Sequence, residues 1–352
     1  MKKIFRHGLV VGKFSPLHRG HELIIQRAIA ECDEVTVISY SVPEFKGCEA
    51  HRRELWLTKL FPMIRCLVIS EETIAGWKRQ YKLDMKLPPN DAPDDDHRYF
   101  IYQISKNILH TQFDAVFTSE SYGDGFAARL SESYRQDDIH AAAVKHVLVD
   151  QERKLVSISG TQIRTDIHAH RRWLSPAVYA SFVHRICLLG GESSGKSTLA
   201  KALAEHFNTK FVPEYGRELW EHKKGNLVFE DMLHIAQEQI AREEQAAQEA
   251  NRFFFCDTSP LTTLFYSNHL FGKIDSALVG LAKRSYDLMV LCDINFPFMQ
   301  DGTRQPASFR ELQHQWYLEE LKKRRIPFTL VSGVVDKRID QICEKIFGSY
   351  CL

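Results

Sequence analysis

The sequence predicts an α/β protein with two doubly wound parallel sheets, one in each half of the chain. Three observations support this prediction. Strand-like apolar runs alternate with helical stretches from one end of the chain to the other. A length of 352 residues, with 44 % hydrophobic and 26 % charged residues, suits two ordinary domains. A glycine-rich loop also follows a buried strand in mid-sequence. We expect one domain over residues 1–183 and the other over residues 184–352.

The expected strands form two series. The first lies near residues 8–11, 34–39, 66–70, 114–118 and 144–149, and the second near residues 186–189, 210–212, 253–256, 288–292 and 327–331. Helices are expected between them. Residues 173–184 contain Pro176 near their start and predict a helix that links the domains. Residues 86–96 hold three prolines and four aspartates, which predicts a loop.

Charge and cysteine content exclude several classes of protein. The net charge of +1 gives no general argument for binding nucleic acid or a membrane surface. Eight cysteines without a C-x-x-C pair suggest neither a zinc site nor a disulfide framework, and favour a reducing cytoplasm. The first apolar run is too short for a signal peptide or a membrane span. We expect a cytoplasmic protein with small-molecule partners; the sequence leaves open whether it forms a homo-oligomer.

A complete phosphate-binding loop lies within residues 188–199. Gly190 and Gly195 frame the G-x-x-x-x-G-K-[ST] spacing, so backbone N–H groups can turn toward phosphate oxygens at the start of a helix. Lys196 is expected to reach the β- and γ-phosphates, and Ser197 to hold Mg²⁺. The alternative is a glycine-rich turn without a ligand. The candidate ATP-binding residues here are Gly190, Gly191, Glu192, Ser193, Ser194, Gly195, Ser197 and Thr198.

A second phosphate-binding pattern follows the first strand. His18 and His21 lie three residues apart at an expected helix N-terminus, where the helix dipole and free N–H groups favour phosphate. Each ring can donate a hydrogen bond to a phosphoryl group under in-line attack, and Lys13 adds a positive charge. A lone histidine would more often be structural, but the H-x-G-H spacing after a strand favours a functional pair. Gly12, Phe14 and Gly20 complete this candidate nucleotide site.

Residues 158–164 follow the last strand of the same half. Ser159 or Thr161 can cap a helix and expose N–H groups to phosphate, with Gly160 between them. Arg164 would lie one turn inside the helix and reach the same oxygens. Alone, this segment could be merely a capped helix. Paired with the H-x-G-H segment, it predicts a closed nucleotide site.

The two segments together, G-K-F-x-P-x-H-x-G-H and I-S-G-T-x-I-R, resemble the nucleotidyltransferase superfamily, which transfers AMP or CMP from a triphosphate and releases pyrophosphate. With the phosphate loop and residues 213–218, 257–258 and 301–304, the chain resembles the bifunctional nicotinamide-nucleotide adenylyltransferase/ribosylnicotinamide kinase family of the NadR type. The resemblance covers almost the whole chain.

This resemblance implies a Rossmann-like nucleotidyltransferase domain followed by a P-loop kinase domain. The kinase would phosphorylate ribosylnicotinamide to nicotinamide mononucleotide (NMN), and the first domain would transfer AMP from ATP to NMN, giving NAD and pyrophosphate. Some members of the family also carry an N-terminal helix-turn-helix module. Here the first expected strand begins close to the first residue, so no DNA binding is expected.

Candidate catalytic residues of the kinase lie at strand ends. Asp257 ends an apolar strand, the usual place for a carboxylate that holds Mg²⁺-bound water or accepts the substrate hydroxyl proton. It could instead cap the helix after Pro260. Arg304 lies in the loop 295–304, which resembles a kinase lid, and would neutralise the transferring phosphate. The alternative is a surface arginine.

Candidate substrate-binding residues follow from the resemblance. Glu214, Tyr215 and Arg217 would contact ribosylnicotinamide, although Glu214 could equally be a first-turn helix acid. Trp77 would stack on the nicotinamide ring in the first domain, although a core or surface tryptophan is as good an interpretation.

Two other functions stay open. One is a cytidylyltransferase or phosphopantetheine adenylyltransferase fused to a different nucleoside kinase. The other is a nucleotide-sensing regulator that binds ATP or NAD without turnover. His18, His21, Lys196 and Asp257 argue against a sensor, since binding alone needs no such charge-stabilising set.

Overall fold

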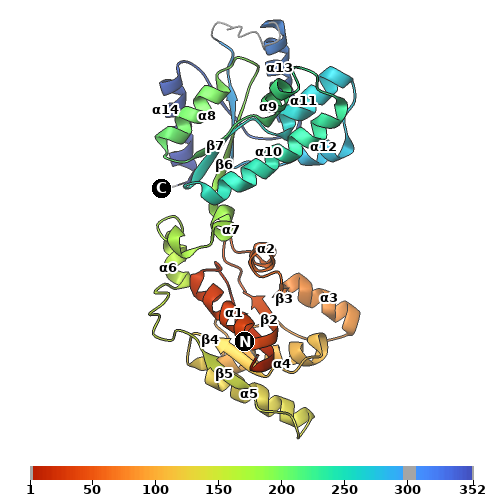
Figure 1. The fold of residues 1–352 in the computed structure, drawn as a ribbon, viewed down its shortest axis with the longest axis vertical. Helices are drawn as coiled ribbons and strands as arrows, with labels where there is room; N and C mark the ends of the chain where they lie inside the picture. The colour runs from red at the N-terminus through yellow and green to blue at the C-terminus, as the bar shows by residue number, and fades with distance from the viewer. Residues whose placement is uncertain (1–2, 296–306, 351–352) are drawn as a thin grey trace. The chain divides into compact units, whose positions relative to one another are not determined.

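The computed structural model describes residues 3–295 and 307–350 (Figure 1). The chain divides into two compact units, Met1–Ser181 and Phe182–Leu352. The expected boundary near residue 183 lies just inside the second unit. Each unit contains one five-stranded sheet whose neighbouring strands all run parallel, as the α/β prediction requires.

The first unit is a doubly wound α/β fold. Its sheet has the order β3-β2-β1-β4-β5, so the connections reverse direction between β1 and β4. In open parallel sheets, ligands bind at the carboxyl ends of the strands beside such a reversal. The elements are β1 (Phe5–Gly12), α1 (Arg19–Glu31), β2 (Cys32–Tyr40), α2 (Ala50–Leu60), β3 (Arg65–Ile69), α3 (Glu71–Tyr81), α4 (Asp94–Ile104), β4 (Ala115–Thr118), α5 (Tyr122–Asp137), β5 (Lys145–Leu148), α6 (Gly160–Thr165) and α7 (Pro176–Tyr179).

The second unit is also doubly wound, with the order β10-β9-β6-β8-β7. Its central strand is buried from Ile186 to Leu189, because helices cover both faces of a parallel sheet. The elements are β6 (His184–Leu189), α8 (Lys196–His206), β7 (Lys210–Val212), α9 (Tyr215–His222), α10 (Phe229–Glu249), β8 (Phe253–Asp257), α11 (Pro260–Phe271), α12 (Ser276–Leu281), β9 (Leu288–Cys292), α13 (Ala307–Lys323), β10 (Thr329–Val331) and α14 (Val335–Tyr350).

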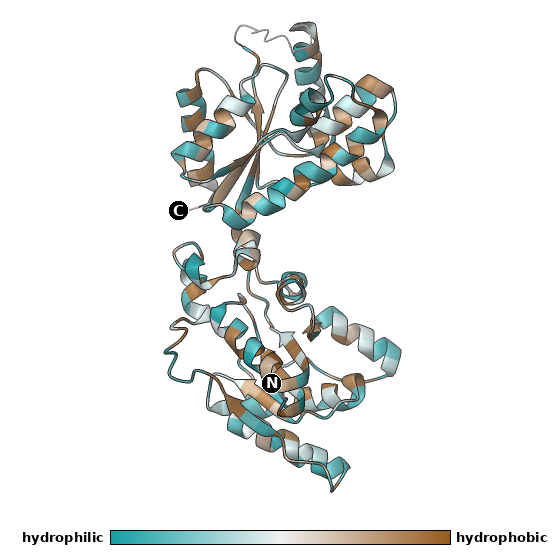
Figure 2. Cartoon of the chain, viewed as in Figure 1, coloured by the Kyte–Doolittle hydropathy of each residue, from teal (hydrophilic) through white to brown (hydrophobic). Residues whose placement is uncertain are grey.

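Each unit buries its own apolar core between sheet and helices. In the first unit, Leu9, Ile38 and Val116 from three neighbouring strands pack with Phe100 and Ile101 of α4. In the second, the core joins residues of β6, β8, β9 and β10 to α8 and α14. Most helices carry both hydrophobic and hydrophilic residues, as expected for helices with one face on a sheet (Figure 2).

Two local predictions are wrong. The helix expected over residues 173–184 is reduced to the single turn of α7, which begins at Pro176, followed by a 3₁₀ turn over Ala180–Phe182. It cannot extend further because His184 already pairs with Phe253 in the sheet. The loop expected over residues 86–96 ends early. Asp94, Asp95 and Asp96 form the first turn of α4, where carboxylates favour the positive end of the helix dipole.

In the part of the chain that the structure describes, we find no helix with the length and apolar character needed to cross a membrane.

Candidate active sites

The loop between β1 and α1 holds both histidines of the first candidate site. His18 is the N-cap residue of α1, and its Nδ1 accepts a hydrogen bond from the backbone N–H of Gly20 at 3.1 Å. A ring nitrogen that accepts carries no proton, so the proton of the neutral ring lies on Nε2. The local fold thus fixes the tautomer in which His18 Nε2–H is available as a donor.

His21 lies in the first turn of α1 and stacks on His18. The ring centroids are 3.8 Å apart with 29° between the planes, and Phe14 packs edge-on against His21 at 5.0 Å. Burial, helped by the charge of Arg153, lowers the pKa of His18 to about 4 and the pKa of His21 well below its ordinary value. Both rings are therefore neutral hydrogen-bonding groups at neutral pH in the free protein.

Helix α6 brings the second predicted segment to the same place. Ser159 is the cap: its Oγ accepts from the N–H of Gln162 at 3.2 Å, and Gln162 Oε1 accepts from the N–H of Ser159 at 3.0 Å. Arg164 donates to the carbonyl oxygen of Ser15 at 2.6 Å and to Thr161 Oγ1 at 3.0 Å. The arginine therefore ties α6 to the histidine loop.

Lys13 lies beside this arrangement. Its Nζ donates to the carbonyl oxygen of Asn90 at 3.1 Å, and burial together with the charge of Arg164 lowers its pKa. The fully buried Arg53 donates to Ser39 Oγ at 2.8 Å and to Glu44 at 2.7 Å, and the Ser39 hydroxyl donates to the carbonyl oxygen of Lys13 at 3.3 Å. The positive charges of Lys13 and Arg164 thus face one site, as a polyphosphate ligand requires.

These side chains line a cavity of about 560 Å³. The predicted residues that line it are Gly12, Lys13, Phe14, His18, Gly20, His21, Ser159, Gly160, Thr161 and Arg164. Other lining residues were not predicted from the sequence: Tyr40, His97, Arg98, Tyr122 and Arg153. The Tyr40 hydroxyl is hydrogen-bonded to His97 Nδ1 at 2.9 Å. Tyr40 ends β2 beside β1, so the rule that ligands bind at strand ends could have found it.

Trp77, which was expected to contact a nicotinamide ring or to be a core residue, does not line this cavity. It lies on α3, where Ile74 and Trp77 are three residues apart and pack together against the apolar core of the first unit. Residues with this spacing share one helix face, so Trp77 follows the amphipathic pattern of its helix.

In the second unit, the phosphate loop joins β6 to α8. Gly190 has φ +150° and Gly195 has φ +78°, conformations that favour glycine. A Cβ atom on Gly190 would also lie 2.8 Å from the carbonyl oxygen of Cys292. Lys196 Nζ donates to the carbonyl oxygens of Gly190 and Gly191 at 2.9 and 3.2 Å, so the lysine side chain folds back onto the first residues of its own loop.

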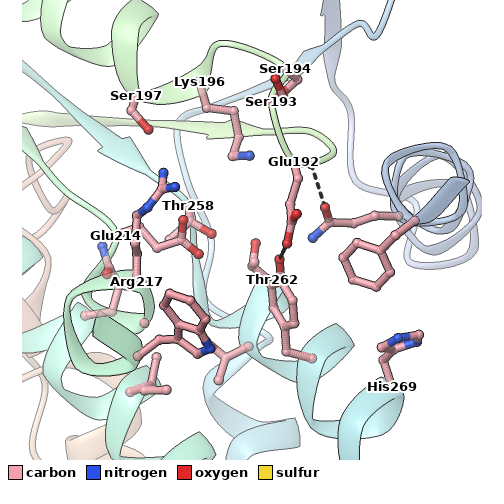
Figure 3. A pocket seen from close by; sticks show the side chains of 18 of the residues that line it. Glu192, Ser193, Ser194, Lys196, Ser197, Glu214, Arg217, Thr258, Thr262 and His269 are labelled. Atoms are coloured by element: carbon pink, nitrogen blue, oxygen red, sulfur yellow. Dashed lines mark hydrogen bonds between the residues drawn. The ribbon is translucent and has the colours of Figure 1, made fainter. Parts of the chain in front are cut away.

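Two carboxylates lie at the carboxyl ends of neighbouring strands. Asp257 ends β8 and Glu214 follows β7, which is paired with β8. Neither side chain caps a helix: Ser259 caps α11, and Glu214 makes no cap hydrogen bond to α9. The cap alternative raised for Asp257 is therefore excluded, whereas Glu214 occupies the N-cap position of α9 without a side-chain cap hydrogen bond. In Figure 3, Glu214 and Lys196 point toward a shared space.

The protonation of these two acids is coupled. Burial raises the pKa of both carboxyl groups, and the charge of Asp257 raises the pKa of Glu214 further. The charges of Lys196 and Arg217 oppose this, as does a hydrogen bond between Asp257 and Ser197. Glu214 is thus a carboxyl group with a pKa above its ordinary value, close to the nucleotide loop.

The residues present fit a magnesium ion. Asp257 Oδ1 is buried and lacks a hydrogen-bond partner within residues 3–295 and 307–350, and the Ser197 hydroxyl lies beside the same carboxyl group. Over those ranges we find no group of three or more His, Cys, Asp or Glu residues placed to hold a metal. Mg²⁺ keeps several waters and is typically held by one or two carboxylates together with nucleotide phosphates, and Asp257 with Ser197 offers one such carboxylate.

A cavity of about 290 Å³ joins the phosphate loop to an aromatic wall. Tyr266 donates to Glu192 at 2.8 Å, and Gln313 Oε1 accepts from the backbone N–H of Glu192 at 2.9 Å (Figure 3). The predicted residues that line the cavity are Glu192, Ser193, Ser194, Gly195, Lys196, Ser197, Thr198, Glu214 and Arg217. Further lining residues were not predicted from the sequence: Trp220, Gln239, Thr258, Tyr266, His269 and Phe309.

Tyr215 is not among the residues that line this cavity, and the same holds for the predicted residues Gly190, Gly191 and Asp257. The Tyr215 hydroxyl is hydrogen-bonded to His234 Nε2 at 3.0 Å, and the Arg242 guanidinium lies 4.4 Å from the centre of the Tyr215 ring. Both partners belong to α10, so Tyr215 fastens α9 to that helix. Arg304, and nearly all of the loop 295–304 expected to act as a lid, lie outside the described residues.

Comparison with known proteins places these sites in a family. An AAA domain family matches residues 185–338. The "Trifunctional NAD biosynthesis/regulator protein NadR" of Salmonella typhimurium is 30 % identical over 345 residues, covering 92 % of this chain and 78 % of that protein. The protein of the same name from Escherichia coli is 30 % identical over 346 residues, with the same coverage.

Two solved structures share the fold over essentially the full chain. A NadR protein in complex with NR has a TM-score of 0.65 and 20 % identity, and covers 98 % of this chain and 96 % of its own. A NadR protein in complex with NAD and AMP-PNP has a TM-score of 0.68 and 18 % identity, and covers 100 % and 99 %. On the identity and coverage of the curated relatives, the chain belongs to the NadR family of NAD biosynthesis proteins.

Proposed function

We propose that the chain carries out two consecutive ATP-dependent steps of NAD synthesis. The second unit phosphorylates the 5′-hydroxyl of ribosylnicotinamide to give NMN, and the first unit transfers AMP from ATP to NMN, releasing pyrophosphate. The names of the curated relatives and the NR, NAD and AMP-PNP bound to structures of the same fold support this proposal. The observation that carries it is one cavity that holds both the phosphate loop and a wall of carboxylates and aromatic rings.

That cavity suits a positively charged nucleoside. The nicotinamide ring of ribosylnicotinamide is a pyridinium with a fixed positive charge. Glu192 and Glu214 supply negative charge, and Trp220 and Tyr266 supply aromatic faces that attract cations. A neutral nucleoside would gain less from the same lining. The nucleoside therefore binds at the aromatic end, with its 5′-hydroxyl toward the phosphate loop.

The two carboxylates divide the roles that sequence reasoning gave to Asp257 alone. Asp257 and Ser197 would hold Mg²⁺, which neutralises phosphate charge during transfer. Glu214, whose pKa is raised by burial and by Asp257, accepts the proton of the 5′-hydroxyl as the oxygen attacks the γ-phosphorus. Lys196 stabilises the β- and γ-phosphates, and ADP leaves. Arg304 keeps its predicted role of neutralising the transferring phosphate.

In the first unit the chemistry is electrostatic. The NMN phosphate attacks the α-phosphorus of ATP, and the bond to the pyrophosphate oxygen breaks. His18 Nε2–H and His21 donate hydrogen bonds to the phosphoryl oxygens as charge develops there, while Lys13 and Arg164 bind the departing phosphates. These preorganised donors need no reorganisation during the reaction.

Incubation with ribosylnicotinamide and Mg-ATP tests the proposal, with NMN, NAD and ADP quantified by mass spectrometry. We expect NMN first and NAD after it. NMN should also be adenylylated faster than pantetheine phosphate or choline phosphate, since it is the product of the neighbouring kinase. Preference for another acceptor would identify a different fused pair. Tight ATP or NAD binding without any product would identify a sensor.

A further inference from the structure

Gln239 is a buried polar residue in the wall of the kinase cavity, and the proposed reaction does not use it. It lies on α10 and is 1 % exposed. Met232 and Ile235, seven and four residues earlier on the same helix, line the cavity as well. This spacing places all three on one helix face, so Gln239 belongs to the side of α10 that faces the ligand space.

The orientation of its amide is fixed from outside the cavity. The backbone N–H of Tyr215 donates to Gln239 Oε1 at 3.0 Å, which identifies that atom as the oxygen and leaves Nε2 as the other arm. Nε2 is buried and has no hydrogen-bond partner among the residues that the structure describes. Buried donors are nearly always paired in folded proteins, so an unpaired donor in a ligand cavity indicates a ligand acceptor.

We propose that Gln239 determines the base specificity of the kinase by donating from Nε2 to an uncharged carbonyl oxygen on the base, the carboxamide oxygen of ribosylnicotinamide. This inference rests on the proposed kinase function. The pyridinium nitrogen has no lone pair, so the carboxamide oxygen is the strong acceptor of this base. The ribose hydroxyls can instead donate to the carboxylate of Glu214, an acceptor-only group when ionised.

The test compares three substrates that differ only at the pyridinium substituent: ribosylnicotinamide, 3-acetylpyridine riboside and unsubstituted pyridine riboside. Acetylpyridine keeps the carbonyl oxygen but lacks the amide N–H. In the wild-type protein, kcat/KM for both carbonyl-bearing substrates should exceed that for pyridine riboside by about 10- to 100-fold. In Gln239→Met, which keeps the side-chain length without a donor, this ratio should fall to about 3-fold or less.

Two further variants separate recognition from folding. Gln239→Met leaves the Tyr215 N–H without its acceptor, so Gln239→Glu provides a second variant that keeps an acceptor and replaces the donor with an oxygen. It should lose the preference for the carbonyl-bearing substrates when its carboxyl group is ionised. The matched control is Gln237→Met, an exposed glutamine of the same helix, which should keep the wild-type ratio. A purely structural role for Gln239 would lower activity on all three substrates equally.

The inference is overturned if folded Gln239→Met keeps the wild-type ratio, or if acetylpyridine riboside behaves like pyridine riboside in the wild-type protein. Both results would leave the kinase assignment intact. A wild-type protein that phosphorylates none of the three ribosides overturns the proposed function itself.

Discussion

His18 has two roles that substitution can separate. It caps α1 through Nδ1, and it presents Nε2–H to the nucleotide cavity of the first unit. His18→Ala removes both roles, whereas His18→Asn restores a side-chain oxygen that caps a helix well. Because both variants lack the imidazole ring, the comparison between them isolates the cap.

The two roles of His18 set the expected magnitudes. Loss of a single donor to a developing phosphoryl charge costs about 10²- to 10³-fold in kcat, so both variants should lose NAD formation from NMN and ATP to this extent. A cap is worth about 1 kcal/mol, so the asparagine variant should be more stable than the alanine variant by this amount, or about 2–4 °C in Tm for a unit of this size.

The assay is NAD formation from NMN and Mg-ATP, paired with thermal unfolding and with kinase activity as the control. Near-normal kcat in His18→Asn would show that His18 is only a cap. Equal stability of the two variants would show that the cap contributes nothing, and would refute the argument from the Gly20 N–H.

Three other predictions concern buried titratable groups. The folded-state pKa of His18, about 4, lies below its ordinary value of 6.5, so the contribution of neutral His18 to stability is fully present above pH 6.5 and is lost as the pH falls toward 4. His21 acts in the same direction. Thermal unfolding measured against pH should show the first unit losing stability over this range, and a flat profile would contradict this prediction. Glu214→Gln should lower the kcat of the kinase by about 10²- to 10⁴-fold with little change in the KM for ATP, and unchanged kcat in steady-state assays would exclude Glu214 as the base. Glu243 is fully buried and accepts hydrogen bonds from Arg284 at 2.7 Å and from Tyr286 at 3.0 Å. Glu243→Ala should therefore lower the free energy of unfolding of the second unit by about 3 kcal/mol, measured by denaturant unfolding. A loss of less than about 1 kcal/mol would show that Glu244, which also pairs with Arg284, compensates.

Local spacing explains why most of the two candidate sites could be predicted from the sequence. The H-x-G-H segment and the phosphate loop each connect a strand to a helix, so a run of adjacent residues places its own N–H groups and side chains. Asp257 could be predicted because it ends an apolar strand, and Glu214, which lies at the neighbouring strand end, could be predicted from the family resemblance. Their protonation could not, since it depends on burial and on the distance between them.

Residues that reach a site from distant segments carry no local pattern. His97 is hydrogen-bonded to Tyr40, which lies 57 residues earlier in the sequence. Gln239 lies on α10, whose sequence pattern is that of an ordinary amphipathic helix. Trp77 and Tyr215 show the opposite case. Both are residue types suited to binding an aromatic ring, but helix packing directs one toward the core of its unit and the other toward α10.

The central claim, that each unit carries its own phosphoryl chemistry, is tested most directly by Lys196→Ala. The folded variant is assayed once with ribosylnicotinamide and once with NMN, each with Mg-ATP. It should form no NMN from ribosylnicotinamide, because Lys196 belongs to the phosphate loop of the second unit, and should form NAD from supplied NMN at close to the wild-type rate. Equal loss of both products would contradict the assignment of one reaction to each unit.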